Sequence, residues 1–473
     1  ASVLLTEKGY ALTYVDISTG ESFMTDGLEK KQVLDLIQSL DIREVVCPLR
    51  FDEAFIENLR DHDRLVSFSD DYQITEHKYI SHLERDQKRS ASFLLNYLVN
   101  TQKQMINHMM PFKIVEQIGH MHIDYRVKKH LEIDEPLANQ SQSTLVHWIN
   151  GCQTAMGSRQ LKQMINHPLY DIKALNERYD LIDAFKPYQP RERVIDHLRY
   201  IYDINRIVGR VAFNTVNARD LYQLKETLRQ VPDLKEALKL YQDPKLDLLI
   251  SQMDDHKKLY EFLESSIHPE PPITLKDGGI INEGFDQKLD ELRNIASNGQ
   301  KWLSDFETKE RETTGIRNLR VGYNRVFGYY IEVSKGNASL VKDEFGYERK
   351  QTLANSERYI TPLLKEKEDD LLHAKDRSIT LEYDLFKEIR TFTESFTYSL
   401  QELSVQIAKL DVFLNLAIVA EKYNFIRPTL HDKRTVEVLK GRHPVVERFT
   451  KFVANDVIMD EGEIFLITGP NMS

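Results

Sequence analysis

The sequence predicts a multidomain protein that combines α and α/β parts. Its 473 residues are too many for a single core and indicate roughly three or four domains. Strand and helix patterns alternate over residues 1–112, and strand patterns return after about residue 425. Between them the patterns are helical. No glycine occurs between Gly346 and Gly441, which favours unusually long helices.

Residues 1–112 predict a small α/β domain. Residues 10–17 predict a strand and residues 18–21 a turn. Apolar residues at helical spacing follow over residues 28–40, and residues 44–47 predict the next strand, which Pro48 closes. This alternation of strands and helices is typical of an α/β domain.

From about residue 113 the sequence predicts helices. Apolar residues recur at i, i+3 or i+4 in four segments: 158–165, 174–185, 191–208 and 218–231. Prolines are expected to punctuate them: Pro168, Pro187, Pro190 and Pro232. The clearest linker is residues 268–272, and a turn follows it at residues 277–279.

Two predicted long helices flank a short β-rich island. One helix covers residues 285–312, and the other covers residues 363–396, which is about 50 Å at 1.5 Å per residue. Between them, residues 319–333 alternate apolar and polar side chains around a predicted hairpin turn at 324–328. We therefore expect the island at the tip of two helical arms, far from the main body. A further helix is predicted over residues 397–423.

The last part of the chain predicts the opening of another α/β domain. Strands are expected at residues 435–439 and 463–468, with a turn at 441–444. The second strand leads into Gly469, as a phosphate-binding loop begins. That loop reads Gly, four residues, then Gly-Lys-Ser/Thr, and only its first five residues are present, Gly469 to Ser473. Without the lysine and hydroxyl, we expect no ATP hydrolysis and little nucleotide affinity in the chain as given.

Composition excludes several function classes. The net charge of −11 argues against coating nucleic acid with bulk positive charge, so any DNA contact must be local. Cys47 and Cys152 are far apart, which predicts neither a disulfide nor a metal site and fits a reducing cytoplasm. No apolar run approaches the ~20 residues of a membrane span; residues 413–420 come nearest and predict a buried helix face.

The β-rich island is locally basic. Residues 309–350 hold nine basic and six acidic residues, a local net charge of +3, and residues 313–331 hold three arginines and no acid. Such a patch is sufficient to neutralise DNA phosphates without reading bases. A solvated hairpin with ordinary surface charge explains the spacing equally well.

Two isolated features do not indicate catalysis. Asp16 lies on an early strand, but the nearby acids Asp41, Asp52 and Glu53 lack the pattern of a metal-dependent nuclease. Asp16 is therefore predicted to face a turn or cap it. His443 has no accompanying nucleophile and is predicted to be structural. We predict no catalytic residue and no metal site.

Four stretches together resemble the bacterial MutS mismatch-repair family, and the resemblance covers essentially the whole chain. The first is Thr154-Ala155-Met156-Gly157-Ser158-Arg159 with Pro168-Leu169 beyond it. The second and third are residues 321–331 and 349–360. The fourth is Gly441-Arg442-His443-Pro444-Val445-Val446-Glu447, followed by residues 467–472.

The resemblance implies five parts. Residues 1–112 would be a connector with a ribonuclease-H-like fold, and 113–286 and 357–424 the helical core and lever. Residues 287–356 would be a DNA-backbone-binding clamp inserted in the lever, and 425–473 the start of a P-loop ATPase domain, cut within Walker A. The family's mismatch-reading domain and most of its ATPase are absent from this sequence.

The resemblance also implies site residues and partners. The DNA-binding candidates are Lys309, Arg317, Arg320, Asn324, Arg325, Lys335 and Asn337. The candidates for nucleotide binding are Gly469, Pro470, Asn471, Met472, Ser473 and Phe452, although Phe452 also fits an ordinary core position. ATP and Mg²⁺ would be cofactors of the parent protein, and neither is expected to bind this fragment. The expected partners are mismatched double-stranded DNA, a second copy of the parent protein and a MutL-type repair protein bound through the connector, in a cytoplasmic, nucleoid-associated setting.

Two other functions remain open at this point. A chromosome-organising ATPase also joins long helices to a nucleotide-binding head, but its helices are much longer and carry a hinge. A ribonuclease-H-like nuclease would need acids that this sequence does not place together.

Overall fold

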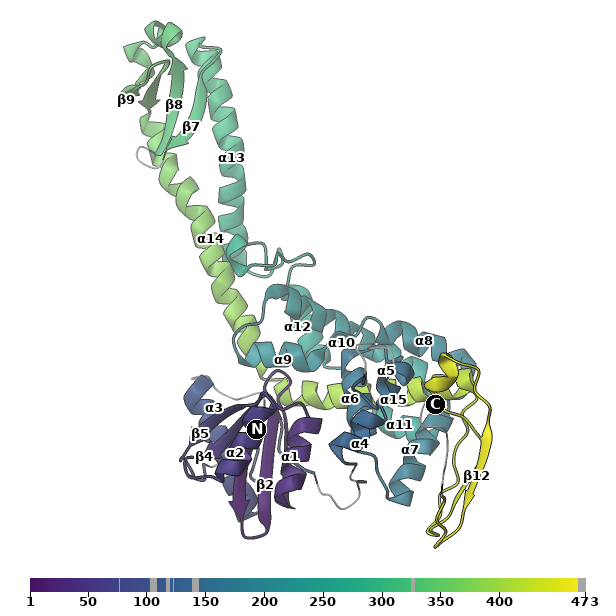
Figure 1. Cartoon of the computed structure of the whole chain (residues 1–473). Coiled ribbons are helices and arrows are strands. Elements are labelled where there is room, and N and C mark those ends of the chain that lie inside the picture. The colour runs from purple at the N-terminus through teal and green to yellow at the C-terminus, as the bar shows by residue number, and fades with distance from the viewer. Residues whose placement is uncertain are drawn as a thin grey trace. The chain divides into compact units, whose positions relative to one another are not determined.

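The computed structural model describes residues 1–75, 77–102, 109–115, 120, 121, 123–137, 144–324 and 328–466. The described chain divides into two compact units. The first unit holds residues 1–215, 226–257 and 394–473, and the second holds residues 216–225 and 258–393. Figure 1 shows both along the chain, from purple at the N-terminus to yellow at the C-terminus.

The first unit opens with a mixed sheet, as the sequence predicts. Among the described residues its strand order is β5-β4-β1-β2-β3-β6. Strands β1, β2 and β3 form an antiparallel meander, and β4 and β5 run parallel to β1. The strands are β1 Ser2–Thr6, β2 Gly9–Asp16, β3 Glu21–Leu28, β4 Glu44–Pro48, β5 Leu65–Ser69 and β6 Lys113–Ile114.

Helices cover both faces of this sheet. They are α1 Lys30–Ser39, α2 Glu53–Asp61 and α3 Arg85–Gln102. Successive strand residues point to opposite faces, so Val3 packs in one core with α1 and α2, while Leu4 packs in the other with α3. Asp16 at the end of β2 accepts hydrogen bonds from the N–H and hydroxyl of Ser18, which confirms its predicted turn role.

The helical part of the first unit gathers around α15, Thr397–Tyr423. Helices α6, α7 and α9 pack against it. The elements in this part are α4 Tyr125–His130, α5 Leu145–Ile149, α6 Ala155–Asn166, α7 Ile172–Ala184, α8 Tyr188–Leu198, α9 Ile204–Ala212, α10 Ala218–Lys239, which starts in the second unit, and α11 Pro244–Ser251.

Helix α15 is apolar because it is a core helix. Among the described residues it is the one helix long and apolar enough to cross a membrane by composition. However, 61% of its most apolar window is buried inside the structure. Phe413, Leu414, Ala417 and Val419 are buried, which confirms the predicted buried face. Packing against neighbouring helices therefore accounts for its apolar sequence.

Two polar residues of α15 hold the loop that starts α6. The Asp411 carboxylate accepts hydrogen bonds from the Gln153 N–H at 2.9 Å, the Thr154 N–H at 2.8 Å and the Thr154 hydroxyl at 2.7 Å. One turn later, Asn415 accepts from the Gly151 N–H and donates to the Ile149 carbonyl. Burial raises the pKa of Asp411, although its hydrogen-bond donors oppose this shift.

The last part of the first unit is a short hairpin. It comprises β11 Val436–Gly441 and β12 Asn455–Met459, with the 3-10 helix η5 Val446–Arg448 between them. The two strands pair antiparallel, with Val436 opposite Met459. Most of their residues are exposed.

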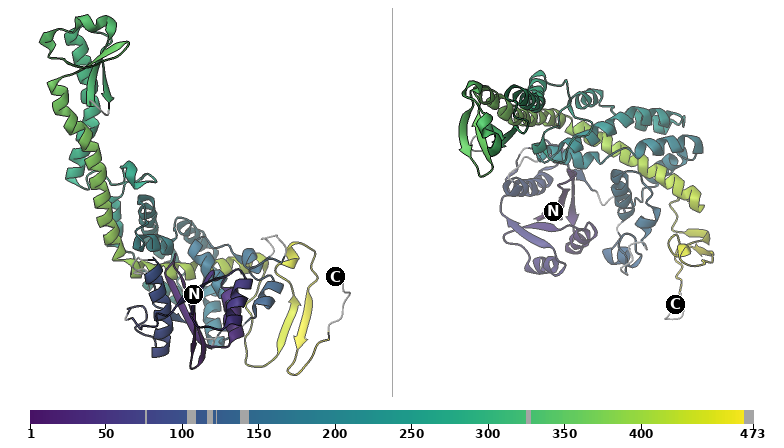
Figure 2. Two further views of the ribbon diagram at one scale, coloured as in Figure 1. Left: turned by 60° about the vertical axis from the view of Figure 1, so that its left-hand side comes forward. Right: turned by 90° about the horizontal axis from the view of Figure 1, so that it is seen from above.

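The second unit contains two long helices that carry a small sheet. Figure 2 shows α13 and α14 leading to the sheet and away from it. The elements are α12 Lys257–Ser266, η2 Leu275–Asp277, α13 Gln287–Thr314, β7 Arg320–Asn324, β8 Gly328–Ser334, η3 Lys335–Leu340, η4 Asp343–Phe345, β9 Glu348–Thr352, β10 Ser356–Ile360 and α14 Pro362–Glu394.

The small sheet packs one face against the ends of these helices. Among the described residues its strand order is β7-β8-β10-β9, and each neighbouring pair is antiparallel. Ile331, Val333 and Tyr359 form a buried core with Phe306 of α13 and Leu364 of α14. Within this unit, the β-rich island therefore lies at the end of two arms.

Several predicted elements differ from the structure. Residues 191–208 form two helices, because Asp203 caps a new helix by accepting from the Arg206 N–H. Pro232 lies inside α10 and does not end it. Leu228, Val231 and Leu234 are buried on both sides of it, and this packing outweighs the roughly 3 kcal/mol that an interior proline costs.

The C-terminal strands were also misplaced. Residues 463–466, predicted to begin a strand, form none among the described residues, and β12 was not foreseen. Strands β9 and β10 were missed because their residues are polar and only the register with β8 makes them strands. Strand β10 straddles the predicted clamp boundary at residue 356, and the domain boundaries stay predictions.

Replacing Gly157 by alanine is expected to lower the free energy of unfolding by about 1–3 kcal/mol, as overpacking does. A Cβ atom at Gly157 would lie 2.3 Å from an Asp411 carboxylate oxygen in a buried site. Urea unfolding measures the change. Gly336→Ala is the control, because no atom lies within 4 Å of its Cβ position. Equal stability of both variants would contradict this role of Asp411.

Candidate nucleic-acid interface

Strand β7 runs back along the end of α13. The Arg311 Nε donates to the Leu319 carbonyl at 2.7 Å, and the Val321 N–H donates to Glu307 at 2.8 Å. The chain reverses at Gly315, a left-handed residue with φ of 71° that ends α13. As a result, the turn at residues 315–319 forms the outer end of the second unit.

A side-chain network joins two segments at this outer end. Asn318 donates to the Ser334 hydroxyl at 2.7 Å, and Asn337 donates to Asn318 at 2.7 Å. Arg317 precedes Asn318, and Lys335 follows Ser334. The network therefore brings the predicted candidates Arg317, Lys335 and Asn337 together, with Arg320 at the nearby start of β7.

The basic residues of this region fall into two groups. Five contact acids through ion pairs: Arg311 with Glu307, Arg349 with Glu357, Arg358 with Glu332, Lys342 with Glu344 and Lys350 with Glu348. The second group is Lys309, Arg317, Arg320 and Lys335, which are exposed. Among the side chains that the structure describes in this unit (258–299, 301–324, 328–368 and 373–393), no acid lies within 4.0 Å of these four cations. Their charge is available to an external anion.

The other candidates lie apart from this group. Asn324 sits at the opposite end of β7, about 13 Å from Arg320 at 3.3 Å per residue, and is half-buried. Arg325 lies outside the described residues. Lys309 projects from α13, one turn before its last residues. The outer-end residues thus form one candidate site, and Asn324 lies apart from it.

Arg358 was not foreseen, and it organises the open face of the sheet. Its guanidinium lies 4.3 Å from the centre of the Tyr330 ring and pairs with Glu332 at 2.9 Å. A Cβ atom on Gly322 would lie 2.8 Å from the same ring, so glycine lets Tyr330 pack across β7. Only the strand register reveals this role, because Arg358 pairs opposite Glu332 across β10 and β8.

A buried ion pair lies near the other end of α13 and α14. Glu382 of α14 is 2% exposed. It accepts two hydrogen bonds from Arg293 of α13, at 2.9 and 3.2 Å, and one from the Ile280 N–H at 2.9 Å. Arg293 also donates to the Ile281 carbonyl at 2.8 Å. This pair fastens both helices and the preceding loop together.

The predicted nucleotide residues are only partly described. Gly469, Pro470, Asn471, Met472 and Ser473 lie outside the described residues. Phe452 lies three residues before β12 and is 37% exposed, so its ring is not a core side chain here. This position leaves the ring accessible to a stacking partner.

The sequence did not predict the contacts of three arginines near the C-terminal hairpin. Arg427 contacts Asp180 and Asp183 of α7, at 2.7 and 2.9 Å. Arg442 donates to the carbonyls of Tyr423 and Asn424 at the end of α15. Arg448 lies against two aromatic rings. Arg442 stands in a quoted motif, whereas no sequence signal marked the partners of the other two.

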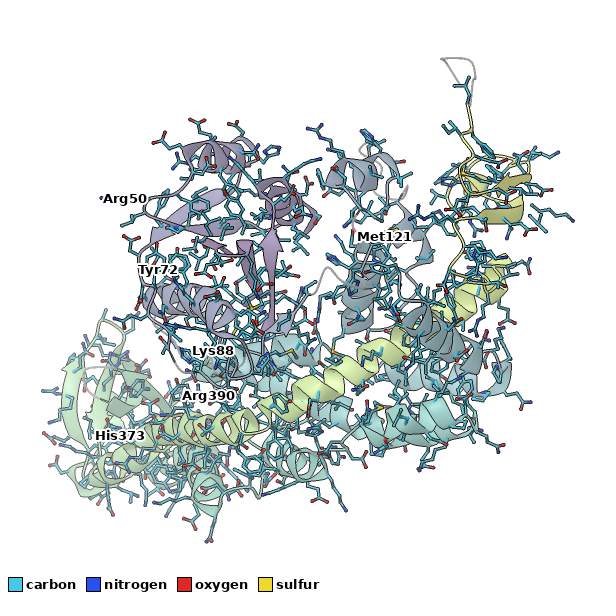
Figure 3. The ribbon with its side chains drawn as sticks, turned by 90° about the horizontal axis from the view of Figure 1, so that it is seen from below. Arg50, Tyr72, Lys88, Met121, His373 and Arg390 are labelled. Atoms are coloured by element: carbon cyan, nitrogen blue, oxygen red, sulfur yellow. The ribbon has the colours of Figure 1, made fainter. Side chains whose placement is uncertain are left out.

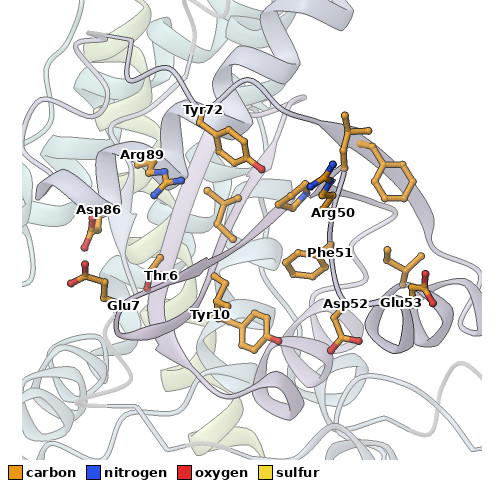
Figure 4. Close-up of a pocket in the computed structure, with 16 residues that line it drawn as sticks. Thr6, Glu7, Tyr10, Arg50, Phe51, Asp52, Glu53, Tyr72, Asp86 and Arg89 are labelled. Carbon is orange, nitrogen blue, oxygen red and sulfur yellow. The ribbon is translucent and has the colours of Figure 1, made fainter.

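A cavity of about 1040 Å³ lies at the carboxyl ends of β1, β4 and β5 (Figure 4). Arg50 and Tyr72 are among the residues that line it (Figure 4), and Figure 3 labels both side chains. The Arg89 guanidinium lies 5.3 Å from the centre of the Tyr72 ring. None of the predicted DNA-binding or nucleotide-binding residues lines it.

Family models match two long parts of the chain. The model of MutS domain II matches residues 1–110, and the model of MutS domain III matches residues 128–417. The chain belongs to the MutS family. This membership confirms the resemblance seen in the sequence and removes the two alternative classes, the chromosome-organising ATPase and the ribonuclease-H-like nuclease.

Curated bacterial relatives match essentially the whole chain. DNA mismatch repair protein MutS of Acholeplasma laidlawii is 45% identical over 473 residues, which is 100% of this chain and 56% of the relative. The proteins of the same name from Geobacillus kaustophilus and Listeria monocytogenes serotype 4b are each 40% identical over 98% of this chain, and it covers 53% and 55% of them. The MutS chain described here thus spans about half the length of these relatives.

Replacing Arg293 by methionine is expected to lower the free energy of unfolding by about 3 kcal/mol, because Glu382 would remain buried without its cation. Adding Glu382→Gln should recover part of the loss, and a double-mutant cycle by urea unfolding measures the coupling. Lys387→Met is the control. Its pair with Asp384 is exposed, so little change in the free energy of unfolding is expected. Additive single effects would contradict the coupling.

Proposed function

We propose that this chain is the connector, lever and clamp portion of a DNA mismatch-repair ATPase, and that the outer end of the second unit grips the DNA backbone. The observation that carries this proposal is the sorting of charges. Arg317, Arg320 and Lys335 gather at one end without an ion-pair partner among the described residues, while five neighbouring cations are neutralised. Unpaired cations that share one end of a rigid sheet suit phosphate contact.

The grip would be independent of base sequence. Arginine and lysine side chains that contact phosphates fix position on the duplex and carry no direct sequence information. Asn337 adds a neutral amide beside the cations, held by its bond to Asn318. The names of the relatives, DNA mismatch repair protein MutS, support mismatched double-stranded DNA as the substrate.

The remaining assignments follow from the family. The parent protein would bind ATP with Mg²⁺ through the loop that begins at Gly469, and Phe452 would stack on the adenine. The parent would act as a homodimer in the bacterial cytoplasm, associated with the nucleoid, and the connector would contact a MutL-type partner. The sheet order β3-β2-β1-β4-β5 supports a ribonuclease-H-like connector. The long helices α13 and α14 would transmit the ATP state to the clamp.

Removing two cations at the outer end tests the DNA proposal. The double variant Arg317→Ala/Lys335→Ala is expected to bind a duplex more weakly and to reduce the slope of log Kd against log salt by about 2, one per lost phosphate contact. Fluorescence anisotropy at several salt concentrations, with matched and mismatched duplexes, measures both quantities. The loss should be the same on both duplexes.

The control removes the same charge from paired positions. Lys342→Ala/Lys350→Ala deletes two lysines that contact Glu344 and Glu348, and its salt slope should stay close to that of the parent. If both double variants shift the slope equally, bulk charge and not the outer-end site explains binding. An unchanged slope in Arg317→Ala/Lys335→Ala would refute the phosphate contacts.

A further inference from the structure

Arg448 lies between two aromatic rings of the helical core. Its guanidinium is 3.8 Å from the centre of the Trp148 ring on α5 and 3.4 Å from the centre of the Tyr423 ring at the end of α15. The two rings meet edge to face, with their centres 5.3 Å apart. Arg448 belongs to η5, inside the segment that precedes the predicted nucleotide loop. It therefore joins that segment to two helices at once.

This contact differs from an ion pair. Within the described residues the Arg448 guanidinium has no carboxylate partner. Its Nε lies 3.4 Å from the Pro444 carbonyl, and its Nη2 is buried without a hydrogen bond. Withdrawal from two neutral rings leaves no buried charge behind, whereas withdrawal from a buried carboxylate would. The aromatic contact can therefore open and close at lower cost than a buried ion pair.

The rest of the segment is lightly attached. Strands β11 and β12 are mostly exposed. Arg442 donates to backbone carbonyls at the end of α15 and pairs with Glu447 of η5 at 3.5 Å, and Arg427 lies four residues after α15 in the chain. Two arginines thus join η5 to the helices: Arg442 holds Glu447 at the end of α15, and Arg448 lies directly on the rings of Trp148 and Tyr423. Of the two, Arg448 is the one that contacts α5.

Trp148 is connected onward to α15. The neighbouring Ile149 carbonyl accepts from Asn415, and Gly151 donates to the same side chain. Helix α15 begins three residues after α14 ends, and α14 carries the clamp sheet. A displacement at Trp148 would thereby act on α15, the helix that follows α14 in the chain.

We propose that Arg448 is a positioning residue that couples the nucleotide segment to α15, so that the ATP state alters the grip on DNA. This inference rests on the proposed function. Arg448 touches neither nucleotide nor DNA in this role. Its effect lies in the coupling between the two sites and not in the affinity of either.

The test uses the full-length protein with its complete ATPase domain. Affinity for a mismatched duplex is measured without nucleotide, with ADP and with a non-hydrolysable ATP analogue. In the parent protein we expect the ratio of the two nucleotide-bound affinities to differ from one by about fivefold or more. In Arg448→Ala the ratio should approach one, while the affinity for DNA without nucleotide and the affinity for ATP without DNA stay near those of the parent. Arg448→Lys should behave the same way, because it keeps the charge and loses the planar stack.

Arg434→Ala is the matched control, since Arg434 is an exposed arginine of the same segment, and its ratio should equal that of the parent. A parental ratio in Arg448→Ala and Arg448→Lys would overturn the inference. Equal losses of DNA affinity in every nucleotide state would also overturn it, because they indicate a structural role. If the parent itself shows no nucleotide-dependent affinity, the proposed function fails together with the inference.

A second readout needs no DNA. In a full-length variant that keeps Trp148 and carries phenylalanine at Trp302 and at any tryptophan outside residues 1–473, Trp148 is the reporter beside Arg448. The emission of Trp148 is expected to shift when ATP binds, and this shift should be lost in Arg448→Lys, a variant that keeps the charge if Arg448→Ala fails to fold. If the emission of Trp148 does not change when ATP binds to the variant that keeps Arg448, the inference is overturned.

Discussion

The buried pair between Arg293 and Glu382 is the constraint on which the candidate DNA site depends. The small sheet of the second unit has its core on the ends of α13 and α14, so its orientation follows the separation of these helices. Glu382 fixes that separation near their other end, because it bonds α13 and the Ile280 backbone at once. A buried carboxylate with three donors tolerates little displacement. The cations at the outer end are therefore placed by a contact far along the same helices.

The first unit has a similar buried acid on α15. Asp411, like Glu382, is a buried acid on a long helix that accepts backbone N–H groups from a non-helical loop. In both places a glycine lies against that helix: Gly157 against Asp411, and Gly278 against Ile379, one turn before Glu382. Long helices are regular and cannot by themselves hold irregular loops. A single carboxylate satisfies several loop donors, and at Asp411 the glycine also provides the space for it.

Much of the helical architecture could be predicted, because it depends on local signals. The predicted range 397–423 coincides with α15, since the apolar pattern and the lack of glycine both extend over it. The candidate site was predicted only in part. The strand register places Glu332 opposite both Arg320 and Arg358. Glu332 forms its ion pair with Arg358, and the sequence alone does not show which arginine it takes. The continuation of α10 through Pro232 depends likewise on packing with distant residues. Such pairings are made between segments that the sequence does not show to be adjacent.

The contacts of the chain separate fixed joints from movable ones by their chemistry. Where the geometry must be constant, at Glu382 and Asp411, a buried carboxylate meets directional donors, and breaking the contact would expose an unsatisfied charge. Where η5 meets the helices, Arg448 lies against aromatic rings that are neutral, so no unpaired charge stays buried when the contact breaks. The proposed function, in which a nucleotide state acts over long helices, would use both kinds of contact. The rigid contacts hold α13 and α14 at a fixed separation, and the aromatic contact leaves η5 able to move.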